Sequence, residues 1–311
     1  MSKRDFRTIF DFSSEEILHV FNLARELKRE VPQKRFVRRL QDKVLAMIFE
    51  KPSLRTRCTF EIAITQMGGS AIYLGPGEIG LGKRESTYDI AKNLERWFDM
   101  VMIRTFAQKN VDDLGQYCSL PVINALSDEF HPCQAMADFL TILEKRESFD
   151  GFKLAYLGDG DNICQSLIDL TARLGCEIRV ASPEAYHPHP ERLARAREEA
   201  GKTGAKILIT TDLAEAVEGV DAVYTDVWAS MGQEQEAEIR KQVFQIYQLN
   251  AESIRGAKPD CWIMHDLPAH RGEEITDEMM DSPRSIVFDQ AENRLHVQKA
   301  IMVYLDSLVT R

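Results

Sequence analysis

One stretch of the chain, residues 49–57, gathers side chains that bind anions. A continuous apolar run over residues 44–49 leads into it, as expected of a strand buried on both faces. Apolar residues at helical spacing follow as far as Gly68-Gly69, so a helix begins within the stretch. The start of that helix carries two hydroxyl and two guanidinium groups, from Ser53, Arg55, Thr56 and Arg57. Helix N-termini attract anions, so we predict a phosphate-sized site; the alternative is an ordinary capped helix with solvated arginines.

Two further predicted strands end in polar side chains. Residues 100–103 lead into Arg104-Thr105, and residues 122–124 are followed by a helix that opens at His131 with Gln134 in its first turn. Ligands of open parallel sheets bind beyond the carboxyl ends of the strands. We therefore expect the three polar clusters to face one crevice; the alternative is three separate surface features.

A second series of alternating strands and helices begins after residues 146–153, where apolar periodicity lapses. The predicted strands cover residues 154–157, 178–180, 207–209, 222–224 and 261–264. Strands that alternate with helices indicate a doubly wound parallel sheet. We therefore predict an α/β fold of two such domains, residues 1–148 and 149–289, which suits a chain of 311 residues.

The first turn of the second domain contains Gly158-Asp159-Gly160, part of a dinucleotide-binding pattern. Ile163 stands where the third glycine belongs, and the next strand ends in Ala181-Ser182 without an acid for a ribose hydroxyl. A nicotinamide-dependent enzyme is therefore the weaker interpretation.

Four polar residues of the second domain form a candidate amino-acid site. Asp226 and Asp266 come just past predicted strands, Ser230 follows shortly after Asp226, and Asn162 opens a helix. Carboxylates suit ammonium groups and an amide suits a carboxylate. Turn and cap roles would explain Ser230 or Asn162 singly, but they explain two acids just past buried strands less well.

The last predicted helix starts near Phe288 and runs to about Leu308. We place Arg294 in its first turn, where a cation opposes the helix dipole. This arginine is therefore expected to point at an anion.

Composition limits the possible partners and the location. A net charge of −10 argues against nucleic acid as a main partner, and neither a signal peptide nor a membrane span is apparent. The six cysteines form no CxxC pair, and Cys58, Cys164 and Cys176 sit among apolar residues. We expect buried free thiols in a reducing cytoplasm and no zinc or other metal site.

Together these motifs resemble the aspartate/ornithine carbamoyltransferase family over essentially the whole chain. The resemblance is carried by residues 49–57, 102–105, 131–134, 158–160, 226–232, 265–274 and 289–296, and the segment Ser230-Met231-Gly232 is typical of the ornithine enzymes. It implies an active site in the cleft between the two domains and a C-terminal helix (290–311) that packs on the first domain. It also implies a homotrimer in which the glycine-rich loop 75–86 reaches the neighbouring site.

The resemblance also implies site roles. Carbamoyl phosphate would be bound by Ser53, Leu54, Arg55, Thr56, Arg104, His131, Gln134, Leu267 and Arg294. L-Ornithine would be bound by Asn162, Asp226, Ser230, Met231 and Asp266. The catalytic residues would be Thr56, Arg104, His131 and Asp266. A neutral δ-amine would attack the carbamoyl carbon to give L-citrulline and phosphate, with no cofactor or metal.

Three positions depart from the family pattern. Leu54 replaces a threonine, with little expected effect because backbone N–H groups can bind phosphate there, and Gly80 stands where the neighbouring subunit often supplies a glutamine. Asp266 replaces a cysteine that meets the side-chain amine, and a carboxylate there favours the ammonium form. We expect either an alkaline pH optimum or another amine, such as lysine, an N-acylated ornithine or putrescine. The remaining alternative is a non-catalytic protein that only binds carbamoyl phosphate.

Overall fold

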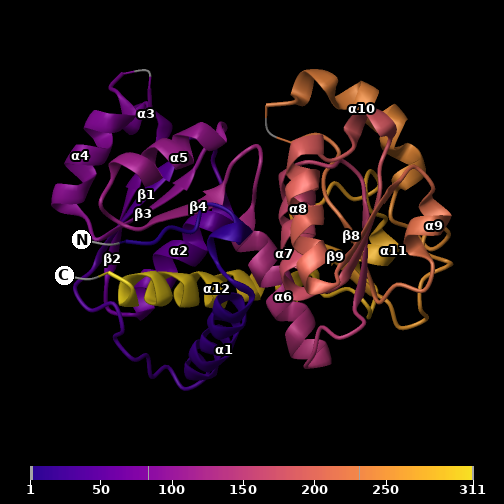
Figure 1. The fold of residues 1–311 in the computed structure, drawn as a ribbon, viewed down its shortest axis with the longest axis horizontal. Coiled ribbons are helices and arrows are strands. Elements are labelled where there is room, and N and C mark those ends of the chain that lie inside the picture. Colours follow the sequence, from indigo (N-terminus) through magenta and orange to yellow (C-terminus); the bar gives the residue numbers. More distant parts are fainter. Residues whose placement is uncertain (1–2, 83, 231, 310–311) are drawn as a thin grey trace. The chain divides into compact units, whose positions relative to one another are not determined.

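A computed structural model describes residues 3–82, 84–230 and 232–309 of the chain. It divides into two compact units, one of residues 1–140 with 292–311 and one of residues 141–291. The division falls inside helix α6 (Pro132–Arg146), ahead of the domain boundary that we place between residues 148 and 149. Each unit holds one wholly parallel sheet, and helices connect its consecutive strands (Figure 1), so the predicted α/β class is confirmed.

The sheet of the first unit has four strands in the order β2-β1-β3-β4. They are β1 (Val44–Phe49), β2 (Ser70–Leu74), β3 (Met100–Arg104) and β4 (Val122–Leu126). The register pairs Phe49 with Arg104, and Arg104 with Leu126. The carboxyl ends of β1, β3 and β4 therefore lie side by side, and the polar clusters that follow them start from one edge of the sheet.

The helices of the first unit begin where the sequence provides caps. They are α1 (Ser14–Glu30), α2 (Leu54–Gln66), α3 (Pro76–Ile79), α4 (Thr87–Trp97), α5 (Gln108–Tyr117), the start of α6 and most of α12 (Val287–Ser307), preceded by the 3-10 turn η1 (Ile9–Asp11). Ser13 and Ser86 each accept a backbone N–H three residues ahead, as N-caps do. The segment 75–86, expected to be only a loop, contains α3, whose first residue is Pro76.

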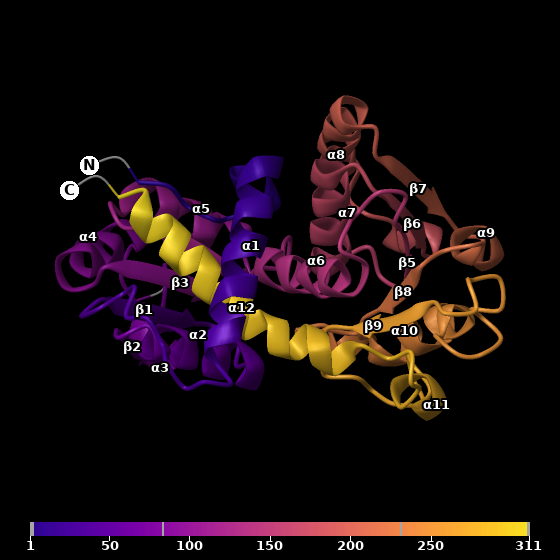
Figure 2. The same cartoon turned by 90° about the horizontal axis from the view of Figure 1, so that it is seen from below.

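Helix α12 begins at Val287, next to the start near Phe288 that its sequence predicts. The backbone N–H of Gln290 donates to the carbonyl of Ile286, so the first turn is complete before Arg294. The expectation that Arg294 opposes the dipole in the first turn is therefore wrong. The helix packs on α1 (Figure 2), where Lys28 Nζ donates to Asn293 Oδ1 at 2.8 Å and Tyr304 Oη to Glu16 Oε1 at 2.6 Å.

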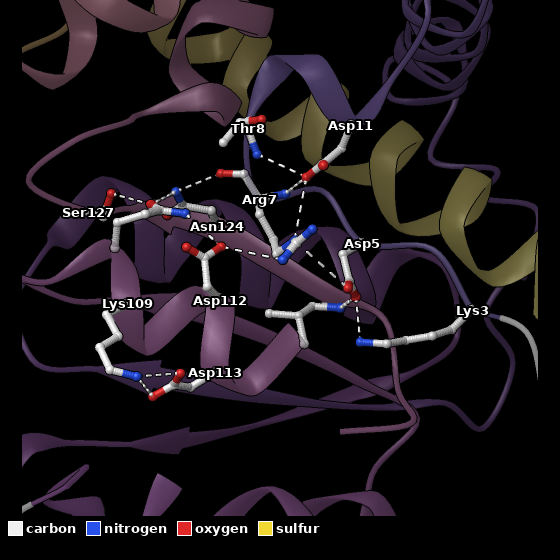
Figure 3. A network of polar contacts seen from close by, with 12 residues as sticks. Lys3, Asp5, Arg7, Thr8, Asp11, Lys109, Asp112, Asp113, Asn124 and Ser127 are labelled. Atoms are coloured by element: carbon white, nitrogen blue, oxygen red, sulfur yellow. Dashed lines mark hydrogen bonds and ion pairs between the residues drawn. The ribbon is translucent and has the colours of Figure 1, made fainter. Parts of the chain in front are cut away.

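The N-terminal segment covers the edge of β4 (Figure 3). Asp5 accepts the backbone N–H of Val122 at 2.9 Å, and Phe6 pairs in parallel with Ile123. Asn124 Nδ2 donates to the carbonyl of Arg7 at 2.9 Å. These bonds satisfy backbone groups that a bare edge strand would leave open.

The second unit has five parallel strands in the order β7-β6-β5-β8-β9. They are β5 (Lys153–Leu157), β6 (Glu177–Ala181), β7 (Lys206–Thr210), β8 (Ala222–Thr225) and β9 (Trp262–His265). Its helices are α7 (Asn162–Leu174), α8 (Pro190–Thr203), α9 (Leu213–Val217), α10 (Ala237–Phe244) and α11 (Asp277–Met280), with 3-10 turns η2 (Glu184–Tyr186), η3 (Glu234–Glu236) and η4 (Gln245–Tyr247). The register pairs Leu157 with Thr225, and Thr225 with His265. The residues that follow β5, β8 and β9 therefore leave the sheet at one edge.

Close packing explains the glycine at position 160, in the turn after β5. A Cβ on Gly160 would lie 2.4 Å from the backbone nitrogen of Pro188, so only glycine fits against that segment. Close packing of two backbone segments thus accounts for Gly160 without a pyrophosphate.

All six cysteines are free thiols. Five are buried, but Cys58 is exposed, so its predicted burial is wrong. It lies on the outer side of α2, whose buried side chains include Thr56, Phe60 and Ala63. Apolar neighbours in sequence do not fix which side of a helix a residue occupies.

None of the helices in the described ranges combines the length and the apolar character needed to cross a bilayer.

Candidate active site

The N-terminus of α2 has the features of an anion site. Ser53 caps the helix in an extended conformation, and its Oγ accepts the backbone N–H of Thr56 at 3.3 Å. No acidic residue lies in the first turn, so the helix dipole and the free N–H groups are not neutralised there. Arg55 is half-buried in this turn, and Leu54 is 76% exposed beside it. An anion at this end would meet Ser53, Arg55 and the backbone.

Arg294 reaches this helix end from α12. Its Nη2 donates to Thr56 Oγ1 at 2.7 Å, and both residues are buried. Ser53 Oγ also donates to Thr56 Oγ1, at 3.1 Å. Because Thr56 Oγ1 accepts both bonds, its own hydroxyl proton can be donated to a ligand. The fold thus brings a predicted phosphate-binding cation beside the opening stretch from the far end of the sequence.

The turns after β1, β3 and β4 are tied to one another. Thr105 Oγ1 and Asn110 Nδ2 both donate to the carboxylate of Glu50. Lys51 forms an ion pair with Asp128, and its Nζ lies 4.4 Å from the ring centre of Phe106. These bonds hold the three turns at one edge of the sheet, where Arg104 ends β3 as a buried cation.

The surroundings of His131 favour its neutral form. Burial and the nearby charges of Arg294 and Arg104 hold the pKa of its imidazole well below the usual value. A neutral imidazole can donate an N–H to a carbonyl oxygen without adding charge, which is the role that the sequence predicts for it.

Gln134 lies in the first turn of α6, fully buried. Its Nε2 donates to Asp138 Oδ1 at 2.8 Å, one turn further along the helix. Its Oε1 has no hydrogen-bond partner among the described residues. The side chain therefore offers a hydrogen-bond acceptor to a ligand, which suits the NH₂ group of a carbamoyl ligand.

The second unit gathers carboxylates where the first gathers cations. Asp161, Asp226 and Asp266 follow β5, β8 and β9. Burial, the charges of Asp266 and Asp161, and a hydrogen bond with Asp266 raise the pKa of Asp226 well above its usual value. Burial and the charges of Asp159 and Asp266 do the same for the pKa of Asp161. Ionisation of the whole cluster is therefore disfavoured, and a cationic ligand would favour it.

Asp161 was missed by the sequence prediction. It lies beyond the end of β5, in the residues that lead into α7, whereas Asp226 and Asp266 directly follow the last residues of β8 and β9. A search of the whole turn beyond each strand, and not only of its first residue, could have identified it.

His265 orders the turn after β9. The backbone N–H of Leu267 donates to His265 Nδ1 at 2.9 Å, so this nitrogen accepts and the ring proton sits on Nε2, 3.1 Å from Glu274 Oε1. The 3.4 Å separation between Nδ1 and Asp266 Oδ1 is accordingly not an ion pair. Leu267, predicted to contact carbamoyl phosphate, uses its N–H in this turn.

Among the residues that the structure describes, two groups of side chains have the spacing of metal ligands. In each, the ligand atoms lie within 4.8 Å of one another: Asp226, His265 and Asp266 in one, His270, Glu273 and Glu274 in the other. Both histidine nitrogens of the first group already serve hydrogen bonds, and Glu274 of the second accepts from His265 and from the backbone of His270. The donor sets suit hydrogen bonding better than they suit a metal ion.

The segment after β8 carries Ser230 in a turn. Its backbone N–H donates to Gln233 Oε1 and its carbonyl accepts from the backbone of Gln233, both at 3.0 Å. Met231, predicted to bind ornithine, lies outside the described residues. Asn162 is buried as the first residue of α7, and its carbonyl accepts from Ser166 Oγ.

Arg240 on α10 anchors that segment. Its Nη1 donates to Asp159 and, at 3.0 Å, to the carbonyl of Trp228, while its Nε lies 3.1 Å from Glu236. The guanidinium carbon also lies 4.9 Å from the ring centre of Tyr186. One buried side chain thus links the turn after β5 with the turn after β8, a connection that the sequence did not reveal.

Comparison with known proteins identifies the relatives of this chain. Residues 4–144 match the carbamoyl-P binding domain of aspartate/ornithine carbamoyltransferase, and residues 150–305 match its Asp/Orn binding domain. The chain is 47% identical over 302 residues to an ornithine carbamoyltransferase of Halalkalibacterium halodurans, which covers 97% of this chain and 95% of the relative. It is 45% identical to the anabolic enzyme of Pyrococcus furiosus, over 97% of this chain and 96% of that one.

Solved structures agree. The ornithine carbamoyltransferase of Pyrococcus furiosus superposes with a TM-score of 0.96 at 44% identity, over 99% of both chains. The anabolic enzyme of Campylobacter jejuni gives 0.93 at 39% identity, over 98% of this chain and all of that one. The chain belongs to the aspartate/ornithine carbamoyltransferase family.

Proposed function

We propose that this chain transfers the carbamoyl group of carbamoyl phosphate to the δ-amine of L-ornithine, giving L-citrulline and phosphate. The carrying observation is the division of charge: one sheet edge of the first unit gathers guanidinium groups and the equivalent edge of the second gathers carboxylates. The guanidinium groups suit a dianionic acyl phosphate, and the carboxylates suit a diamino acid. Relatives named ornithine carbamoyltransferase, including anabolic forms, favour ornithine and the biosynthetic direction towards arginine. Nothing favours lysine, an N-acylated ornithine or putrescine.

The first unit would bind carbamoyl phosphate. The N-terminus of α2, Ser53, Arg55 and Thr56 suit the phosphate, with Arg294 beside Thr56 as a further cation. Buried Arg104 and neutral His131 suit the carbonyl oxygen, and the acceptor Oε1 of Gln134 suits the carbamoyl NH₂. Leu54 would contribute its backbone, and the family resemblance also implies a contact from Leu267.

The second unit would bind ornithine. Asp226 suits the α-ammonium group, and Asn162, Ser230 and the Met231 backbone suit the remaining α-substituents. Asp266 would meet the δ-amine. The raised pKa of Asp226 supports this assignment, because an arriving ammonium group would compensate the crowded negative charge that raises it.

The chemistry follows from these groups. The δ-amine loses its ammonium proton, its lone pair attacks the carbamoyl carbon, and the C=O electrons move to oxygen. Arg104, His131 and Thr56 stabilise the oxyanion of the tetrahedral intermediate. The intermediate expels phosphate, and loss of the second nitrogen proton leaves the ureido group of citrulline. No step needs a metal or cofactor.

A homotrimer in the cytoplasm is part of the proposal. The family resemblance supports a neighbour's segment 75–86 reaching each site, and 76% exposed Leu54 beside Arg55 offers an apolar surface for a neighbour to cover. Multi-angle light scattering tests the assembly, and a monomer at assay concentration would contradict it.

One assay tests the activity. The protein is incubated with carbamoyl phosphate and, separately, ornithine, lysine, N-acetylornithine or putrescine, and the carbamoylated products are measured by mass spectrometry. Citrulline should form at least tenfold faster than any other product, a ratio that corresponds to about 1.4 kcal/mol. A faster reaction with another amine would overturn the substrate, and carbamoyl phosphate binding without turnover would indicate a non-catalytic protein.

A further inference from the structure

We infer that Asp138 is a positioning residue: its carboxylate fixes the amide of Gln134 so that Oε1 accepts from the carbamoyl NH₂, which makes the site selective for carbamoyl over acyl phosphates that lack an N–H. The inference rests on the proposed function and deepens it. It concerns recognition of carbamoyl phosphate, whereas other residues would recognise the acceptor amine.

The geometry lies on one helix. Gln134 and Asp138 are four residues apart on α6, which places them on the same face one turn apart. Gln134 Nε2 donates to Asp138 Oδ1 at 2.8 Å, and both side chains are fully buried. Gln134 Oε1 is also buried, and none of the described residues donates to it.

A glutamine alone would not determine whether the donor or the acceptor of its amide faces the ligand. Its amide carries a donor NH₂ at one corner and an acceptor oxygen at the other, and a half-turn about the last side-chain bond exchanges them. A carboxylate accepts only, so Asp138 can pair with Nε2 and not with Oε1. The aspartate thereby decides that the remaining corner of the amide is an acceptor.

Gln134 Oε1 lies in the predicted carbamoyl phosphate site, where it can distinguish an NH₂ group from a methyl group. Gln134 occupies the first turn of α6, beyond the carboxyl end of β4, where His131 lies close enough to Arg104 and Arg294 for their charges to lower the pKa of its imidazole. Carbamoyl phosphate has an NH₂ where acetyl phosphate has a methyl group of similar size. Binding of the methyl compound would leave buried Oε1 without a donor, whereas the NH₂ satisfies it.

The second unit contains a matched pair. On α7, Gln165 Nε2 donates to Asp169 Oδ1 at 2.7 Å across the same four-residue spacing. Gln165 and Asp169 are buried, and Gln165 Oε1 likewise has no partner among the described residues. This pair belongs to the other sheet, so it controls for the loss of such a pair without touching the proposed carbamoyl site.

The experiment compares two competing ligands at pH 8. Acetyl phosphate is used as an inhibitor against carbamoyl phosphate, and the ratio of its inhibition constant to the carbamoyl phosphate dissociation constant measures selectivity. We expect a ratio of about tenfold or more for the wild type, the effect of one unsatisfied buried acceptor. Gln134→Met should bring the ratio close to one. Asp138→Asn, which can pair with either corner of the amide, should lower it about threefold or more, and Asp169→Asn should leave it unchanged.

Each outcome has one meaning. A wild-type ratio in folded Asp138→Asn, with the ratio lost in Gln134→Met, overturns the role of Asp138 and leaves the proposed function standing. A wild-type protein that makes no citrulline overturns the function itself. If Asp138→Asn does not fold, neutron diffraction of the wild-type protein with carbamoyl phosphate decides: amide deuterons facing Asp138 support the inference, and deuterons facing the substrate overturn it.

Discussion

The two units use one architecture to build sites of opposite charge. In each, three neighbouring parallel strands end at one edge of a sheet, and a helix starts just beyond. The first unit places Arg104, Arg294 and Arg55 there, and the second places Asp161, Asp226 and Asp266. The edge of a parallel sheet therefore supplies the location, and the residues just past the strands supply the sign of the charge.

In both units, the charges that gather at the sheet edge shift the pKa of a buried group nearby. Burial and neighbouring guanidinium groups lower the pKa of His131 in the first unit, and burial and neighbouring carboxylates raise the pKa of Asp226 in the second. In each site, the like charges already present disfavour a further charge of the same sign, and a ligand of the opposite sign would relieve that repulsion. Substitutions that remove one charge from either site test this comparison.

The largest effect is expected from Arg104→Ala in the first unit. It removes a buried donor to the developing oxyanion, so kcat should fall about 10²- to 10³-fold. Steady-state kinetics measures the loss, with circular dichroism to check the fold. Arg57→Ala is the control, because this arginine lies in the same unit, on α2, but is exposed, with its guanidinium carbon 4.4 Å from the ring centre of Tyr73. Equal losses in both variants would argue against a specific role for Arg104.

Asp226→Asn probes the second unit. It removes the charge that would bind the α-ammonium group, so the ornithine dissociation constant should rise about 10- to 100-fold while carbamoyl phosphate binding stays unchanged. Isothermal titration calorimetry with each substrate measures both constants. The exposed carboxylate of Asp277, which pairs with Arg271, gives the control variant Asp277→Asn. A parallel loss of carbamoyl phosphate binding would contradict the division of charge.

The same titration has a predicted pH dependence. The pKa of Asp226 is raised in the free protein, so below that pKa an ornithine ammonium group must displace a proton to bind. Affinity for ornithine should therefore increase as pH rises and level off once the free cluster is ionised. Calorimetry in buffers of different ionisation enthalpy should detect proton release for the wild type and less for Asp226→Asn. Proton uptake on binding would have the wrong sign.

Arg240→Met should give a smaller effect confined to the second unit. Arg240 touches neither predicted substrate, but its bonds to Asp159 and to the carbonyl of Trp228 hold the segment that carries Ser230. Loss of these bonds should raise KM for ornithine about 3- to 10-fold, with kcat and the KM for carbamoyl phosphate little changed. The control is Lys241→Met, the neighbouring cation on α10, which pairs with Glu273. An equal change in both KM values would indicate general destabilisation.

The sequence predicted the parts of these sites that depend on strand ends. Val44–Phe49 has a continuous apolar pattern, and a buried parallel strand of that length was the expected result. Arg104, Asp226 and Asp266 were found because each directly follows such a run. Their grouping at two sheet edges then followed from the general geometry of parallel sheets.

Features that depend on side-chain contacts were not predictable in this way. Arg294 was selected by a wrong argument about a helix start, whereas its contact with Thr56 comes from the packing of α12. Asp138 and Arg240 lie in ordinary helical positions, and only the folded chain shows what their side chains hold. Local sequence patterns predict burial and turns, but they do not predict which residues far apart in the sequence come into contact.

The smallest expected effect concerns Asp266, the residue that replaces a cysteine. A carboxylate near the δ-amine favours its ammonium form and raises the amine pKa, so the pH profile of kcat should lie to the alkaline side of that of Asp266→Cys. Because the charge of Asp266 and a hydrogen bond with it raise the pKa of Asp226, ionisation of both carboxylates together is disfavoured, and the charge that faces the amine is less than that of two free carboxylates. We therefore expect a shift of about one pH unit or less, which corresponds to at most about 1.4 kcal/mol. Measuring kcat for ornithine from pH 6 to pH 10 resolves it, and superimposable profiles would show that Asp266 does not set the protonation of the attacking amine.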